Sequence, residues 1–107
     1  MARKKFQTLT EQMYFILLSL NEEKCGVDIT SFVRKLTNDK VLIGPGTLYT
    51  LLFDFEQEGL IKVTGVEGRR KSYIITDTGR DMLKKEYERL QRQVVAGAEL
   101  LEGKNEK

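Results

Sequence analysis

Four stretches of the chain repeat their apolar residues with a helical period. They run from about residue 10 to 20, from residue 27 or 28 to 38, from residue 45 to 58, and from about residue 78 to 101. Apolar side chains spaced i, i+3, i+4 and i+7 share one face of a helix, so each stretch predicts a helix with a buried side. The predicted core positions are Leu9, Met13, Ile16, Leu17 and Leu20 in the first helix, Ile29, Phe32, Val33 and Leu36 in the second, and Leu48, Leu51, Leu52 and Phe55 in the third.

The ends of these stretches carry residues typical of helix termini. Pro45 suits the first turn of the third helix, because the amide that proline lacks would have no partner within the helix there. Gly59 suits its end, since glycine enters the left-handed conformation at little cost. Threonine and aspartate side chains accept hydrogen bonds from first-turn amides. The N-cap candidates are Thr8 or Thr10 for the first helix and Thr76 or Asp77 for the fourth.

The period changes after Gly59. An extended run reaches Val66, a turn follows at Glu67 and Gly68, and residues 72–76 are rich in strand-favouring residues. Residues 41–43 are short and apolar, and form either a brief strand beside this hairpin or an extended connection. The fold class is therefore mainly α with a small β-hairpin (α+β). Three helices, a hairpin and a long last helix predict a winged helix-turn-helix.

The composition excludes several classes of function. The 107 residues include no histidine and one cysteine, so the commonest general base and metal ligand are missing, and no metal or cofactor is expected. Cys25 is expected to be a small buried residue, with a redox sensor as the alternative. No apolar run has the ~20 residues of a membrane span and no signal peptide is visible, which favours the cytoplasm. We expect no enzymatic activity.

The net charge of +2 alone does not indicate a nucleic-acid partner, but its distribution does. Three cations follow one another near the tip of the hairpin, whereas the acids of the third helix gather at its end. We expect the start of that helix to face DNA bases and the hairpin to grip phosphates. Charge runs are often solvated surface only, which is the alternative for residues 3–5. The predicted DNA-binding residues are Lys5, Pro45, Gly46, Thr47, Tyr49, Thr50, Arg69, Arg70 and Lys71.

The fourth helix is too long for the rest of the domain to cover. Its apolar residues recur at alternating steps of four and three, which is the spacing of a helix–helix seam. The first helix is apolar on nearly all sides, so its second side is a candidate for a partner subunit. A homodimer is therefore predicted; the alternative is a helix packed wholly on its own domain with a frayed end. The predicted dimer residues are Tyr14, Leu18, Leu83, Tyr87, Leu90, Val94 and Leu101.

We accordingly divide the chain into a DNA-binding domain at residues 1–76, a dimerisation helix at 77–102 in the same compact unit, and a disordered tail at 103–107. Residues 44–49 (GPGTLY), 55–61 (FEQEGLI) and 68–79 (GRRKSYIITDTG) in this order resemble the PadR family of transcriptional regulators, most closely its short members. The resemblance implies a recognition helix starting at Pro45, a wing that carries Arg69, Arg70 and Lys71, and a last helix that crosses a two-fold dimer.

Two departures from the family pattern concern the third helix. Gly44 stands where many members have serine, and Phe53 and Asp54 stand where a basic residue is common. Some short members also bind flat aromatic drugs around a tryptophan between their last helices. This chain has no tryptophan; Leu90 occupies that place, with Tyr87 one turn before it. The two residues form either interface core, which we favour, or a pocket for a small hydrophobic or aromatic ligand.

The function predicted by the sequence is a sequence-specific DNA-binding regulator, a homodimeric repressor on a pseudo-palindromic operator, with a small-molecule inducer as an extension. The alternative is a winged helix that binds another protein and has only weak, non-specific affinity for DNA.

Overall fold

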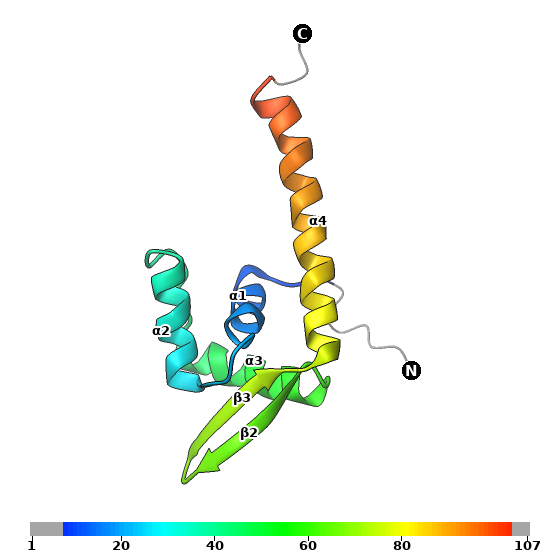
Figure 1. The fold of residues 1–107 in the computed structure, drawn as a ribbon. Helices are drawn as coiled ribbons and strands as arrows, with labels where there is room; N and C mark the ends of the chain where they lie inside the picture. Colours follow the sequence, from blue (N-terminus) through cyan, green and yellow to red (C-terminus); the bar gives the residue numbers. More distant parts are fainter. Residues whose placement is uncertain (1–7, 104–107) are drawn as a thin grey trace.

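The computed structural model describes residues 8–103, which form helices beside a small sheet (Figure 1). The predictions on Lys5 and on residues 104–107 of the tail lie outside this range. The structure confirms the predicted α+β fold with its long last helix. In chain order the elements are α1 Glu11–Ser19, β1 Lys24–Cys25, α2 Gly26–Leu36, α3 Pro45–Gln57, β2 Ile61–Glu67, β3 Arg70–Ile75 and α4 Asp77–Leu101.

The core lies where α1, α2 and α3 meet the base of the sheet. Leu48, Leu52 and Phe55 of α3 are at most 2% exposed, as the periodicity predicts, while Leu51 is only partly buried. Fully burying an apolar side chain of this size stabilises the fold by about 1.5–3 kcal/mol. The third helix therefore packs against the core with one face and exposes its opposite face to solvent.

Local hydrogen bonds define the helix ends that the sequence predicts. The Oγ1 atom of Thr10 accepts the amide of Met13 at 3.2 Å, and the sulfur of Met13 accepts the amide of Thr10, which completes a capping box. At the end of α3, Gly59 has a φ of 75°, and the amide of Leu60 donates to the carbonyl of Phe55. This is a Schellman motif, and it stops α3 at the predicted glycine.

The end of α3 is joined directly to the start of α4. Thr76 caps α4 by accepting the amide of Gly79, and its hydroxyl donates to the carbonyl of Gly59 at 2.7 Å. A Cβ atom on Gly79 would lie 2.1 Å from the carbonyl oxygen of Leu60. Only glycine permits this approach, so the junction fixes the direction in which α4 leaves the domain.

The third strand of the sheet is not at residues 41–43, which form an extended connection without strand pairing. It is β1, in the short segment between the first two helices, where the periodicity predicts no element. The sheet is antiparallel in the order β1-β3-β2, with Lys24 opposite Tyr73 and Cys25 opposite Ser72. A two-residue strand has no periodicity of its own, so it forms only because β3 offers it a partner.

The prediction for the second helix is wrong in two respects. α2 ends at Leu36 rather than Asn38, because Asn38 and Asp39 adopt positive φ values of 54° and 63°. Phe32 and Leu36 are 38% and 51% exposed instead of buried. α2 lies at the edge of the domain (Figure 1), and both side chains remain partly open to solvent. The ammonium of Lys24 instead lies 4.4 Å from the centre of the Phe32 ring.

Candidate nucleic-acid interface

The first turns of α3 present small polar groups to solvent. Thr47, Tyr49 and Thr50 are exposed, and Tyr49 is 49% accessible, whereas the intervening Leu48 is buried. Pro45 and Gly46 are exposed as well, and no acidic residue lies in the first turn. Gly44, at the N-cap, provides no capping side chain. This end of the helix can therefore meet a polyanion without like-charge repulsion.

The hairpin carries its cations close to its tip. β2 and β3 pair from Ile61 opposite Ile75 to Glu67 opposite Arg70, and a bulge lies between Val63 and Gly65. Arg69, Arg70 and Lys71 are exposed, and within residues 8–103 no carboxylate lies within ion-pair distance of any of them. Their charges are therefore available to a ligand.

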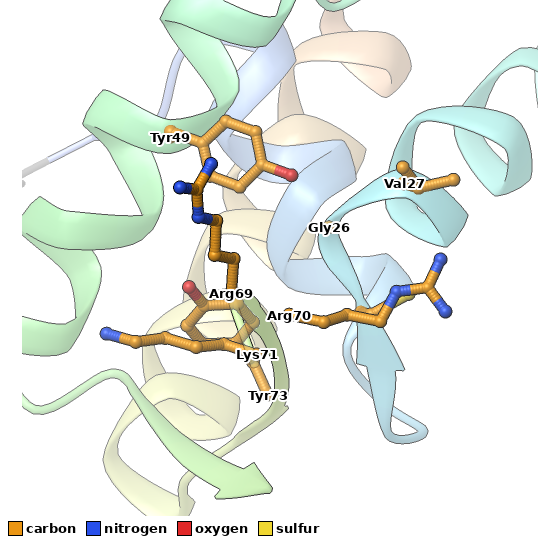
Figure 2. A pocket seen from close by; sticks show the side chains of 8 residues that line it. Gly26, Val27, Tyr49, Arg69, Arg70, Lys71 and Tyr73 are labelled. Carbon is orange, nitrogen blue, oxygen red and sulfur yellow. The ribbon is translucent and has the colours of Figure 1, made fainter. Parts of the chain in front are cut away.

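The hairpin, α3 and the start of α2 line an open cavity of about 450 Å³ (Figure 2). In Figure 2, Arg69 extends from the hairpin towards Tyr49, and the tyrosine hydroxyl points towards the first turn of α2. Tyr73 closes the base and is 6% exposed, as expected for a core residue. Burial raises the pKa of Tyr73, and Glu56 and Tyr49 raise it further. The lining is formed by Cys25, Gly26, Val27, Tyr49, Arg69, Arg70, Lys71 and Tyr73.

Most of the predicted residues of α3 and the hairpin thus lie on adjoining elements, and Tyr49 and the three hairpin cations line one cavity. Sequence reasoning missed the contribution of α2. Cys25, Gly26 and Val27 reach the cavity because β1 pairs with β3, and that pairing has no local signal. Cys25 is buried, as predicted, and its thiol donates to Oδ2 of Asp28 at 3.2 Å.

The predicted dimer residues of α4 differ in their surroundings. Leu83 is 9% exposed and belongs to the core of its own chain. Tyr87 is 50% exposed, and Val94 and Leu101 are 70% and 87% exposed. Tyr14 of α1 joins this surface in a groove of about 370 Å³, whose other lining residues are Tyr87, Leu90, Gln91, Val94 and Val95. Burial raises the pKa of Tyr14, with smaller contributions from Tyr87 and Glu86.

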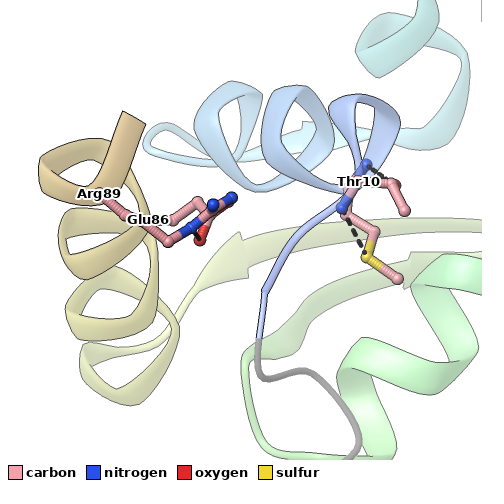
Figure 3. A network of polar contacts seen from close by, with 4 residues as sticks. Thr10, Glu86 and Arg89 are labelled. Carbon is pink, nitrogen blue, oxygen red and sulfur yellow. Dashed lines mark hydrogen bonds and ion pairs between the residues drawn. The ribbon is translucent and has the colours of Figure 1, made fainter. Parts of the chain in front are cut away.

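One carboxylate of α4 is buried away from the hairpin. Glu86 is 5% exposed and is held by the guanidinium of Arg89, which donates through Nε at 3.0 Å and through a second nitrogen (Figure 3). The hydrogen bonds from Arg89 lower the pKa of Glu86, and a backbone hydrogen bond from Leu9 lowers it further against the effect of burial. The carboxylate thereby ties the segment before α1 to α4.

The described part of the chain lacks two other kinds of site. Residues 8–103 contain no group of three or more cysteine, aspartate and glutamate side chains arranged to hold a metal ion. The same residues include no helix with both the length and the apolar character of a membrane span.

Comparison with known proteins agrees with this geometry. Residues 16–85 match the model of the transcriptional regulator PadR-like family, whereas no curated protein matches the chain significantly. A PadR-like transcriptional regulator from Bacillus cereus is 26% identical with a TM-score of 0.70, over 84% of this chain and 90% of that one. A PadR family regulator from Eggerthella lenta is also 26% identical, with a TM-score of 0.71 over 85% and 81%.

Bacillus subtilis PadR, solved in complex with operator DNA, is 28% identical with a TM-score of 0.62, over 70% of this chain and 45% of that one. The family model covers well over half of the chain, and its matched segment runs from α1 through α3 and the β2–β3 hairpin into α4. The chain therefore belongs to the PadR-like family of transcriptional regulators.

Proposed function

We propose that this chain is a DNA-binding regulator that acts as a homodimeric repressor on a pseudo-palindromic operator. The observation that carries the proposal is an exposed, acid-free start of α3 beside three hairpin cations that have no ion-pair partner among residues 8–103. Small polar side chains at a helix start suit base edges, and cations suit phosphates. The operator complex of the related Bacillus subtilis PadR supports the same use of the fold.

In this proposal Thr47 and Thr50 lie near bases in the major groove, and Arg69, Arg70 and Lys71 contact the backbone beside it. The acids Asp54 and Glu56 lie in the second half of α3 and Glu58 lies at its C-cap, away from the exposed start of the helix. Two copies related by a two-fold axis would place their recognition helices in successive major grooves, about 34 Å apart.

A second copy of the chain is the proposed partner of α4. The helix has 25 residues, so its length is about 38 Å, and only its first half packs on the domain. Beyond Leu90 its large apolar residues are 60–87% exposed, which is costly to leave in water. We propose that the dimer covers Tyr14, Leu18, Tyr87, Leu90, Val94 and Leu101; Leu83, already covered by its own chain, supports this surface from below.

The most specific part of the proposal is a small-molecule inducer. A small flat aromatic ligand would lie in the groove formed by Tyr14, Tyr87 and Leu90, between α1 and α4. Because the chain has four tyrosines and no tryptophan, such a ligand should quench tyrosine emission while it weakens DNA binding. If a panel of flat aromatic compounds changes neither signal, the groove is interface core only.

Fluorescence anisotropy tests the DNA-binding proposal directly. The probes are the duplex upstream of the protein's own gene and a scrambled duplex of equal composition, across a salt series. We expect tighter binding to the native duplex, with log K falling by about 0.9 per phosphate neutralised for each unit of log salt. The Arg69→Ala, Arg70→Ala double variant should bind more weakly and with a shallower slope, whereas Lys85→Ala on α4 should match the wild type.

An unchanged slope in the double variant would show that the wing does not contact phosphate. Equal, weak binding to both duplexes would instead favour the alternative of a protein partner, to be sought by affinity capture.

A further inference from the structure

The cavity between the wing and α2 is lined by three cations and two tyrosines, beside Cys25, Gly26 and Val27. Arg69, Arg70 and Lys71 line it from the hairpin, and of these Arg69 extends towards Tyr49, which brings a hydroxyl from α3. Guanidinium and ammonium groups donate hydrogen bonds and cannot accept them. Asp28, which directly follows Val27 in the chain, lies outside the lining, and its carboxylate accepts a hydrogen bond from the thiol of Cys25. Such a lining suits a compact anion.

Tyr49 is held at this cavity by a single glycine. A Cβ atom placed on Gly26 would lie 2.4 Å from the hydroxyl oxygen of Tyr49 and 2.9 Å from two ring carbons. The tyrosine therefore rests on the first residue of α2, and any larger residue at position 26 would displace it. Gly26 has ordinary helical backbone angles, so its conformation does not require glycine and the space for the ring does.

The first turn of α2 adds amides to the same place. Its N-cap, Cys25, makes no capping hydrogen bond with its side chain. The strand pairing of Cys25 with Ser72 places these amides beside the wing cations rather than on a separate face. Free amides and the positive end of a helix dipole both favour an anion.

We propose that this cavity binds one backbone phosphate of duplex DNA, with the Tyr49 hydroxyl, Arg69, Arg70 and the first-turn amides of α2 as donors, and with Gly26 as the residue that positions Tyr49. The inference rests on the proposed DNA-binding function. In this inference α2 helps to position the protein along the DNA through a phosphate contact, and Tyr49 contacts phosphate rather than bases. A free phosphorylated compound offers the same chemistry, so the test must separate the two sources.

The test uses the full chain and the native duplex, in which each backbone phosphate in turn is replaced by a neutral methylphosphonate. The variants are Tyr49→Phe, which removes only the hydroxyl, and Gly26→Ala, which displaces the ring. Ser31→Ala, exposed farther along α2, is the matched control. Alanine is a better helix former than glycine, so Gly26→Ala should melt no lower than the wild type by circular dichroism.

We expect Tyr49→Phe and Gly26→Ala to bind the native duplex roughly tenfold more weakly, as for the loss of a hydrogen bond to a charged group. One methylphosphonate position per half-site should weaken the wild type and the Ser31→Ala control by a similar factor. On the duplex with a methylphosphonate at that position, Tyr49→Phe and Gly26→Ala should bind only slightly more weakly than the wild type does. This non-additivity identifies the phosphate that the cavity holds.

Two results would overturn the proposal, and they are distinguishable from failure of the DNA-binding function. If both variants bind like the wild type while the Arg69→Ala, Arg70→Ala variant is weakened, the function stands and the cavity holds no backbone phosphate. If the wild type binds neither duplex, the isotope-labelled protein is titrated with inorganic phosphate and its amide NMR shifts are followed. Shifts at residues 26 and 27 that Gly26→Ala abolishes would then assign the cavity to a free phosphorylated ligand instead.

Discussion

At the scale of single residues, Glu86 combines burial with charge. It is 5% exposed, yet its carboxylate receives hydrogen bonds from Arg89, so the charge is compensated where it lies. Arg89 remains 34% exposed, and solvent therefore screens part of the attraction. The residue matters less as an ion pair than as the acceptor that joins α4 to the segment before α1.

We predict that Glu86→Gln lowers the free energy of unfolding by about 1–3 kcal/mol at pH 7. The pKa of Glu86 is depressed in the folded protein, so its stabilisation is present above the ordinary value of 4.5 and is lost as the pH falls through the lower folded value. Urea unfolding between pH 7 and pH 3 should show the difference from the wild type shrinking below about pH 4.5.

The control for this measurement is Glu88→Gln, an exposed position on the same helix, which should change stability by less than about 0.5 kcal/mol. A difference between Glu86→Gln and wild type that stays constant down to pH 3 would contradict the role of the charge.

At the scale of elements, the two halves of α4 have different surroundings. Its first half carries Gly79, Leu83 and Glu86 into the domain, and its second half exposes Val94, Val95 and Leu101. A helix apolar on several sides needs cover from more than one direction. This is why we assign a partner copy to the second half of the helix.

Val94→Asp should therefore dissociate the proposed dimer, because a charge in an apolar interface lacks a partner. In sedimentation velocity at micromolar concentration, the wild type should have twice its chain mass of 12.3 kDa and the variant a single mass. Lys84→Asp, exposed nearer the start of α4, should remain dimeric. A wild type that sediments as a monomer would contradict the proposed dimer.

Elements also differ in how well the sequence predicts them. The caps at Thr10 and Thr76 and the stop at Gly59 depend on residues within one turn, and the structure confirms all three. β1 and the exposure of Phe32 depend on distant neighbours, and the periodicity gave the wrong outcome there. Periodicity indicates which side chains share a face, but it does not indicate whether another element covers that face.

At the scale of the whole molecule, the described chain extends 62 × 37 × 21 Å, because α4 leaves the domain as an arm (Figure 1). The hairpin and α4 project in different directions from a common base at the end of α3. The hairpin cations and the exposed start of α3 therefore stay clear of the arm. The arrangement leaves one surface for the proposed DNA and another for the proposed partner copy.

The sequence alone determined the four helices, the caps at Thr10 and Thr76, the stop at Gly59, the hairpin and the family, because these depend on periodicity, on residues one turn apart and on an ordered set of short motifs. Only the tertiary structure decided that β1 pairs with β3, that Leu83 is core and that Gly26 supports Tyr49. Each of these joins residues far apart along the chain, and such contacts are selected by the packing of the whole core rather than by any local pattern.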